Sequence, residues 1–295
     1  MEERILHFII PSNMDGLSVR QVLIREFHFA SSLISRLKQK NDGFCINGKK
    51  VYTTAIVHTG DHLSINISDI NPLNPAEPRY LPLDIKYEDE DLVILNKAPG
   101  VAVHGSDRID SPTIANAYAY HYGSQCSFHP VHRLDKGTSG LIVLAKNAYI
   151  QDRLRRLMHT DMFRREYLAI TEGIIQPSAG TINKPISQKP VTGIRRIIDP
   201  DGLASITQYS TLENANGHSL ISAIPITGRT HQIRVHFSSV GYPLVGDPIY
   251  GSISDLIDRP ALHSYSISIV HPVENKVIEL KQELPEDMEK IINLI

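Results

Sequence analysis

A crowded run of prolines at residues 71–82 does most to limit how this chain can fold. The run reads NPLNPAEPRYLP. Proline fixes its own φ and lacks a backbone N–H, so neither a helix nor a central strand can continue through such a run, and closely spaced prolines act as a semi-rigid spacer. The run predicts a small domain over 14–70, a linker over 71–83 and a large domain over 84–295. Its prolines are Pro72, Pro75, Pro78 and Pro82.

Length and cysteine usage restrict the class of protein. A chain of 295 residues suits one large or two unequal domains, because a domain takes roughly 100–200 residues. The apolar run near the start ends at Pro11 and is too short for a secretion signal, and no run approaches the ~18 apolar residues of a membrane span. Cys45 and Cys126 form no CxxC pair, which predicts reduced packing residues rather than a disulfide framework or zinc site. We expect a cytoplasmic protein without a membrane partner.

The stretch ahead of the linker combines short elements with a surplus of positive charge. Helical spacing of apolar residues over 17–27 and 31–37 precedes strand patterns over 44–51 and 60–65. Residues 17–50 hold seven basic side chains against two acidic ones, although the whole chain has a net charge of −2. A solvated basic face is the commoner explanation of such a surplus, and contacts with RNA phosphates are the alternative. The basic residues are Arg20, Arg25, Arg36, Lys38, Lys40, Lys49 and Lys50.

Short apolar runs after the linker predict a body built mainly on β-structure. Residues 92–95, 141–144 and 233–237 have the composition of strands. Residues 148–160 place apolar side chains at helical spacing opposite basic ones, which predicts an amphipathic helix. Because strands do not alternate regularly with long helices, a doubly wound parallel sheet is disfavoured. The expected fold class is α+β, with a mixed, mainly antiparallel sheet and flanking helices.

One loop has the residues of a catalytic site. Residues 132–140 read HRLDKGTSG and precede an apolar strand. A carboxylate at Asp135, between Arg133 and Lys136, is expected to stay ionised, as a nucleophile or base must. A loop aspartate that makes a turn or a surface ion pair is the alternative reading.

No cofactor is expected from the sequence. The histidine pairs at 129 and 132 and at 231 and 236 lack the spacing of a metal site, which predicts structural roles for them. Neither a Walker loop nor a GxGxxG run after a strand is present, so no nucleotide cofactor is implied.

These segments together carry a family resemblance. HRLDKGTSG closely resembles the HRLDxxTSG signature of the RluA-like pseudouridine synthases. Four further segments are similar to that family's motifs in the same order: residues 89–104, REYLA at 165–169, TGRTHQIRVH at 227–236 with GDPIYG at 246–251, and Leu262-His263 with His271-Pro272. This resemblance covers about 84–285. Residues 14–70 resemble the S4 RNA-binding module.

The resemblance implies a function and a set of site residues. It implies a pseudouridine synthase fold and isomerisation of uridine to pseudouridine in RNA, without a cofactor. Asp135 matches the catalytic aspartate, Tyr167 the tyrosine that stacks on the flipped base, and Arg229 the arginine that pairs with the aspartate. The remaining candidates bind substrate: Leu262 lines the base pocket, Arg133 and Thr138 touch the flipped nucleotide, and Arg36, Lys38, Lys49 and Lys50 contact RNA from the S4-like domain.

Several alternatives stay open at this level. The expected partner is RNA, large-subunit ribosomal RNA rather than tRNA, and the expected state is a monomer. Asp135 can act by covalent attack or by moving a proton on the ribose. A non-catalytic RNA-binding or ribosome-assembly factor is the main rival, although the intact set of Asp135, Tyr167 and Arg229 argues against it. A glycosidase needs a second cooperating carboxylate, and Asp135 has no evident one.

Overall fold

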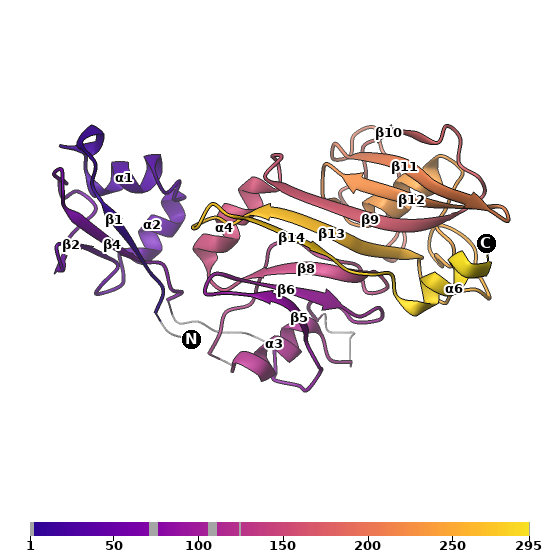
Figure 1. Cartoon of the computed structure of the whole chain (residues 1–295), viewed down its shortest axis with the longest axis horizontal. Coiled ribbons are helices and arrows are strands. Elements are labelled where there is room, and N and C mark those ends of the chain that lie inside the picture. Colours follow the sequence, from indigo (N-terminus) through magenta and orange to yellow (C-terminus); the bar gives the residue numbers. More distant parts are fainter. Residues whose placement is uncertain (1–2, 71–75, 106–110, 124, 295) are drawn as a thin grey trace.

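Two β-sheets organise the computed structural model, which describes residues 3–70, 76–105, 111–123 and 125–294 (Figure 1). The small sheet has the order β1-β4-β2-β3. Two helices, α1 (Val19–Arg25) and α2 (Ser31–Leu37), cover its buried face and confirm the two predicted helices. The strands are β1 (Ile5–Ile9), β2 (Phe44–Ile46), β3 (Lys49–Lys50) and β4 (His62–Asn66), and a 3₁₀ turn spans Ser12–Met14.

The predicted boundaries of the small domain need one correction. Its sheet begins ahead of residue 14, because β1 pairs antiparallel with β4, with Ile5 opposite Asn66. Without β1, β4 would be an exposed edge strand, which proteins usually cover. Residues 71–75 of the predicted linker lie outside the described residues. The following part of the linker contacts the body, where the Asn116 side chain donates to the Glu77 carbonyl at 2.7 Å.

The large sheet confirms the predicted fold class. Its order is β10-β11-β12-β9-β13-β8-β6-β5, with β14 beside β13 and β7 beside β8. Among the described strands, β8 and β13 pair in parallel and the other pairs are antiparallel. The strands are β5 (Asp84–Glu88), β6 (Leu92–Lys97), β7 (His129–Pro130), β8 (Ser139–Ala145), β9 (Phe163–Glu172), β10 (Ala179–Asn183), β11 (Ile206–Ala215), β12 (His218–Pro225), β13 (Leu262–Val270) and β14 (Val277–Lys281).

Four helices flank this sheet, and one of them overturns a prediction. The helices are α3 (Ile114–Tyr122), α4 (Ala148–Leu157), α5 (Gln232–Ser239) and α6 (Glu286–Leu294). α4 confirms the amphipathic helix predicted over 148–160. α5 replaces the strand predicted over 233–237. The alternation of apolar and polar residues there resembled a half-buried strand, but Arg234 and His236 are both buried and have polar partners inside the protein. No helix among the described residues is both long and apolar enough to cross a membrane.

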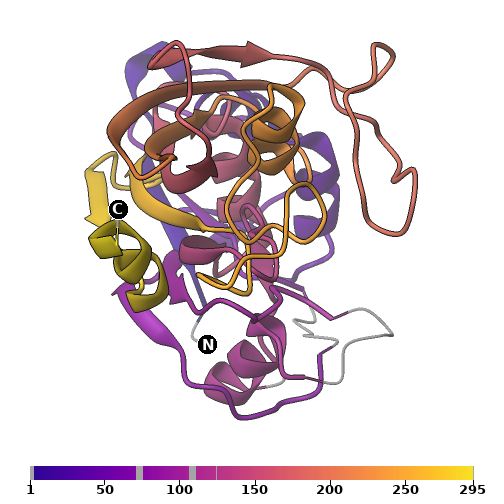
Figure 2. The same ribbon diagram turned by 90° about the vertical axis from the view of Figure 1, so that its right-hand side faces the viewer.

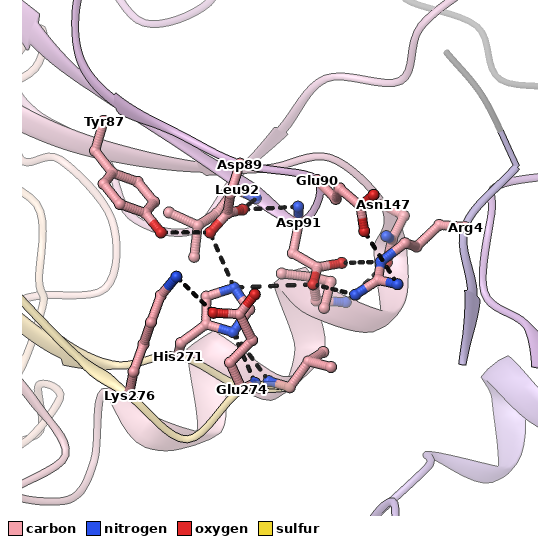
Figure 3. A network of polar contacts seen from close by, with 12 residues as sticks. Arg4, Tyr87, Asp89, Glu90, Asp91, Leu92, Asn147, His271, Glu274 and Lys276 are labelled. Atoms are coloured by element: carbon pink, nitrogen blue, oxygen red, sulfur yellow. Dashed lines mark hydrogen bonds and ion pairs between the residues drawn. The ribbon is translucent and has the colours of Figure 1, made fainter. Parts of the chain in front are cut away.

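A network of charged side chains joins the small domain to the body (Figure 3). Arg4, which precedes β1, donates from Nε and Nη2 to the two carboxylate oxygens of Asp91, both at 2.9 Å. Its Nη1 lies 3.2 Å from Glu90 Oε2. Asp91 is buried, so its charge would be strongly unfavourable without this bidentate partner.

Asp89 and His271 extend the network into the body (Figure 3). His271 is fully buried, and its Nδ1 accepts from the Glu274 backbone N–H at 2.9 Å, which leaves Nε2 to face the carboxylates. Nε2 lies 3.2 Å from Asp89 Oδ2. Burial alone would raise the pKa of Asp89, but contacts with His271, Tyr87 and backbone N–H groups outweigh burial and hold that pKa well below its usual range.

Apolar contacts and two hydrogen bonds complete the junction. The rings of Phe29 and Tyr149 stack with centroids 4.2 Å apart, and the Tyr149 hydroxyl donates to the Phe27 carbonyl at 3.1 Å. Asp69, just before the linker, accepts from the Ala148 backbone N–H at 3.0 Å, at the start of α4. A single hydrophobic cluster runs from the small domain into the body. The two parts therefore pack as one unit, with α4 beside the small domain (Figure 1).

Candidate active site

A cavity of about 1480 Å³ lies against the large sheet and contains the loop predicted to be catalytic. Its walls come from the loop after β6, the loop between β7 and β8, the end of α4, strand β9, the start of α5 and the residues just before β13. Residues 184–205, which project from the body between β10 and β11 (Figure 2), contribute Ile194 and Arg196. Large-sheet elements that are distant in sequence therefore converge on one site.

The position of the catalytic loop depends on one glycine. Gly140 has φ +102, and a Cβ atom at this position would lie 2.3 Å from the Ser264 carbonyl oxygen. Only glycine tolerates both the conformation and the approach. This approach lets β8 run in parallel beside β13, and it fixes where the preceding loop ends. Within the loop, the Thr138 N–H donates to the Asp135 carbonyl at 3.1 Å and closes a turn.

Lys97 ties the loop after β6 to the catalytic loop. Its side chain is fully buried at the end of β6, and Nζ donates to the carbonyls of Ala98, Val101 and Lys136 at 2.9, 2.8 and 3.3 Å. Burial lowers the pKa of Lys97 to about 7, against the opposing effect of the Asp135 charge. The family resemblance gave Lys97 no role, and its burial could not be read from the sequence.

Asp135 has an arginine partner, but not the predicted one. Arg234 on α5 donates from Nη1 to Asp135 Oδ2 at 3.0 Å. It also binds the fully buried Asp247 from Nε and Nη2, at 2.7 and 2.8 Å. Burial would lower the pKa of Arg234, but the two carboxylates outweigh burial and raise it above its usual value. Arg234 is therefore a fixed cation that orients one oxygen of Asp135.

Arg229 lies at the cavity wall without contacting Asp135. Its Nε donates to the Ala204 carbonyl at 3.2 Å, and it forms no ion pair with any described carboxylate. The expected pairing of Arg229 with Asp135 is thus replaced by that of Arg234. A helical reading of 231–237 would have found Arg234, because His231 and Arg234 then share one helix face. His231 Nε2 indeed lies 3.9 Å from Asp135 Oδ2.

His231 directly precedes α5 and is held by a tyrosine that the sequence did not single out. It adopts a left-handed conformation with φ 57°, and its Nδ1 lies 2.9 Å from the Tyr250 hydroxyl. That hydroxyl also accepts from the Arg196 backbone N–H at 2.8 Å, which ties the projecting segment to the site. Burial lowers the pKa of His231, an effect that outweighs the Asp135 charge. The ring is therefore neutral near pH 7.

The structure brings Tyr167, predicted to be catalytic, and the predicted substrate-binding residues of the body to this cavity. Tyr167 on β9 and Leu262 on β13 are both buried and both line it. Burial raises the pKa of the Tyr167 hydroxyl, which keeps the ring neutral. Thr138 is buried in the wall and Arg133 is exposed at the opening. The site thus combines an oriented carboxylate, an aromatic wall, an aliphatic wall and several cations.

The candidates in the small domain lie elsewhere. Arg36 and Lys38 are exposed at the end of α2, and Lys49 and Lys50 are exposed on β3. None of the four lines the cavity. Over the described residues, no group of three or more His, Cys, Asp or Glu side chains is placed to hold a metal ion.

Comparisons with known proteins agree with this geometry. The family model described as RNA pseudouridylate synthase matches residues 91–239. The chain is 36% identical to the uncharacterized RNA pseudouridine synthase YhcT of Bacillus subtilis, over 97% of this chain and 96% of that protein. It is 35% identical to ribosomal large subunit pseudouridine synthase D of Escherichia coli, over 80% and 77%. Human RNA pseudouridylate synthase domain containing 4 superposes with a TM-score of 0.58 at 25% identity, over 71% of this chain and 91% of that one.

Proposed function

The chain belongs to the RNA pseudouridine synthase family, and we propose that it isomerises specific uridines in large-subunit ribosomal RNA with Asp135 as its catalytic carboxylate. Family membership makes it an isomerase of uridine in RNA. Similarity to an Escherichia coli enzyme named for the ribosomal large subunit supports the choice of RNA. The contact of Asp135 with the fixed cation of Arg234, inside a cavity lined by Tyr167 and Leu262, carries the proposed role of Asp135.

The reaction needs few chemical groups. The bond between N1 and C1′ breaks, the base rotates, a bond forms between C5 and C1′, the C5 proton leaves, and N1 takes up a proton. The base must first leave its helix, and we assign Tyr167 and Leu262 to the two faces of the flipped uracil. Asp135 then acts on the ribose or the base, by covalent attack or by transfer of a ribose proton. Both routes need a carboxylate held in one orientation, which the contact with Arg234 provides.

Tritium release tests the proposed substrate. The reaction removes the hydrogen from C5, so a large-subunit ribosomal RNA transcript labelled with tritium at uridine C5 is expected to release label into water when it meets the full chain. A labelled tRNA mixture serves as the comparison and is expected to release none. Release of label from tRNA alone would show that the substrate is tRNA and not ribosomal RNA. Release of label from neither RNA would favour a non-catalytic RNA-binding role.

We propose further that the small domain contacts RNA phosphates through Lys38, Lys49 and Lys50 together with Arg36. All four side chains are exposed. Lys40 is left out, because it is half-buried and donates to the Asn66 side chain at 2.7 Å, a contact that holds the domain itself. The S4-like resemblance and the local charge surplus support this proposal.

Neutralising these lysines is expected to weaken RNA binding in a salt-dependent way. The triple change of Lys38, Lys49 and Lys50 to Gln should make the slope of log affinity against log salt shallower by about 2, since each lost phosphate contact accounts for roughly 0.7 on single strands. Filter binding of the labelled ribosomal transcript at several KCl concentrations measures the slope. A control triple, Lys86, Lys281 and Lys290 to Gln, carries the same change in net charge and should leave the slope unchanged. Equal effects of the two triples would argue against a contact in the small domain.

A further inference from the structure

Arg165 is a charged side chain buried in the cavity wall. It lies on β9, two residues before Tyr167 and on the same face of the strand, and it is 6% exposed. Its guanidinium carbon lies 5.9 Å from the centroid of the Phe163 ring, and the residue lines the cavity. Neighbouring Arg164 points to the other face and is exposed.

Nothing in the described part of the chain neutralises this charge. The Arg165 side chain forms neither a hydrogen bond nor an ion pair with any described residue. The other two buried arginines of the cavity differ, since Arg234 binds Asp135 and Asp247 while Arg259 binds Asp287. The adjacent carboxylate, Glu166, is on the opposite face of β9 and accepts from the Ser222 hydroxyl at 2.5 Å. A buried charge without a partner is strongly unfavourable.

The groups around Arg165 leave its charge uncompensated. His132 is fully buried, and burial first and the Arg165 charge second lower its pKa to about 3, so the imidazole stays neutral. Burial likewise keeps the Tyr167 hydroxyl protonated. A Cβ atom on Gly228 would lie 3.7 Å from Arg165 Nη1, so the end of the guanidinium reaches the loop that carries Arg229. Among the described residues no anion compensates this charge, so an anion from outside the protein would stabilise it.

We propose that Arg165 binds a phosphate that flanks the flipped nucleotide. The inference rests on the proposed function in one respect, that the ligand in this cavity is RNA. Residues two apart on a strand lie roughly 6.6 Å from each other, and a phosphate is one sugar away from the base that it flanks. A base stacked on Tyr167 therefore brings a phosphate within reach of Arg165. The planar guanidinium binds phosphate oxygens in pairs, and the anion supplies the negative charge that the described residues do not provide.

The first test uses the protein without RNA. If the charge of Arg165 has no partner in the free protein, Arg165→Met replaces it with an apolar side chain of similar length and should melt at or above the wild-type temperature. Arg164→Met is the matched control, since Arg164 is exposed and lies 3.6 Å from Asp161. Its melting temperature should stay near that of the wild type. A clearly lower melting temperature for Arg165→Met alone would show that the fold itself uses the charge, and would overturn the proposal.

The second test measures RNA affinity in the same variants. Arg165→Met should bind the ribosomal transcript roughly 10- to 100-fold more weakly, the loss of a hydrogen bond to a charged group, with a salt slope shallower by about 0.7. Arg165→Lys keeps the charge and should keep the slope, with a smaller loss of affinity. Wild-type affinity and slope in Arg165→Met, or an equal loss in Arg164→Met, would contradict a phosphate contact at this position.

The two proposals fail separately in these measurements. Tritium release from neither RNA would remove the proposed substrate, while affinity and melting of the Arg165 variants would still decide whether this side chain binds an RNA phosphate. Wild-type tritium release together with unchanged affinity in Arg165→Met would remove the phosphate contact alone.

Discussion

Asp135→Asn is expected to reduce tritium release from labelled RNA by at least about 10³-fold, a loss typical of removing an essential catalytic group. The amide has the shape of the carboxylate and can still accept from Arg234 Nη1, so the loop and the cavity should keep their structure. It carries no charge, however, and can neither attack covalently nor accept a proton. RNA affinity should therefore stay within a few-fold of the wild type.

A control variant separates chemistry from charge. Asp258 also lines the cavity and is exposed, so Asp258→Asn changes the net charge of the site equally. It should retain tritium release. If Asp135→Asn kept turnover, the central role assigned to Asp135 would be wrong. If both variants lost turnover equally, the effect would belong to the electrostatic potential of the cavity rather than to one carboxylate.

Arg234→Gln is expected to lower the free energy of unfolding by about 3–5 kcal/mol, the usual effect of removing one partner of a buried ion pair. Asp247 is fully buried, and Arg234 donates to both of its carboxylate oxygens. Asp135 loses its cation in the same variant, so tritium release should also disappear. Urea denaturation measures the first effect, and the labelled transcript measures the second.

Two further variants make this test specific. Arg229→Gln should change the free energy of unfolding by no more than about 0.5 kcal/mol, because Arg229 leaves no buried carboxylate behind among the described residues. The double change of Arg234 to Gln and Asp247 to Asn removes both buried charges and should recover much of the lost stability, but not turnover, since Asp135 still lacks its cation. A folded Arg229→Gln protein as inactive as Arg234→Gln would give Arg229 a catalytic part that its contacts do not indicate.

Local pattern predicted much of this fold. The helical spacing over 148–160 identified α4, since one of its faces packs on the sheet and the other is basic and exposed. The apolar runs at 92–95 and 141–144 identified β6 and β8, because central strands buried on both faces are continuously apolar. In each case the burial of one element determines its own sequence pattern.

Prediction from local pattern failed where polar side chains are buried. Arg234 and His236 are polar yet buried. Their alternation with apolar neighbours arises because both side chains bind partners inside the protein, and not because they face solvent. That error also hid the arginine that contacts Asp135. The contact between Arg4 and Asp91 joins residues 87 apart in the sequence, and no local pattern encodes such a pairing. That the described residues offer Arg165 no anionic partner is likewise visible only once its surroundings are known.

The junction between the small domain and the body limits which other domains could replace either part. A body cut free at the prolines would leave Tyr149 without the ring of Phe29 and Asp91 without Arg4. Another RNA-binding domain grafted in front would have to bring its own aromatic ring and its own cation to the same two places. A flexible linker would make it easy to exchange one domain for another. Here only a domain that reproduces the contacts of this junction can take the place of the small domain. The prolines separate the two parts along the sequence, while the packing keeps them a matched pair.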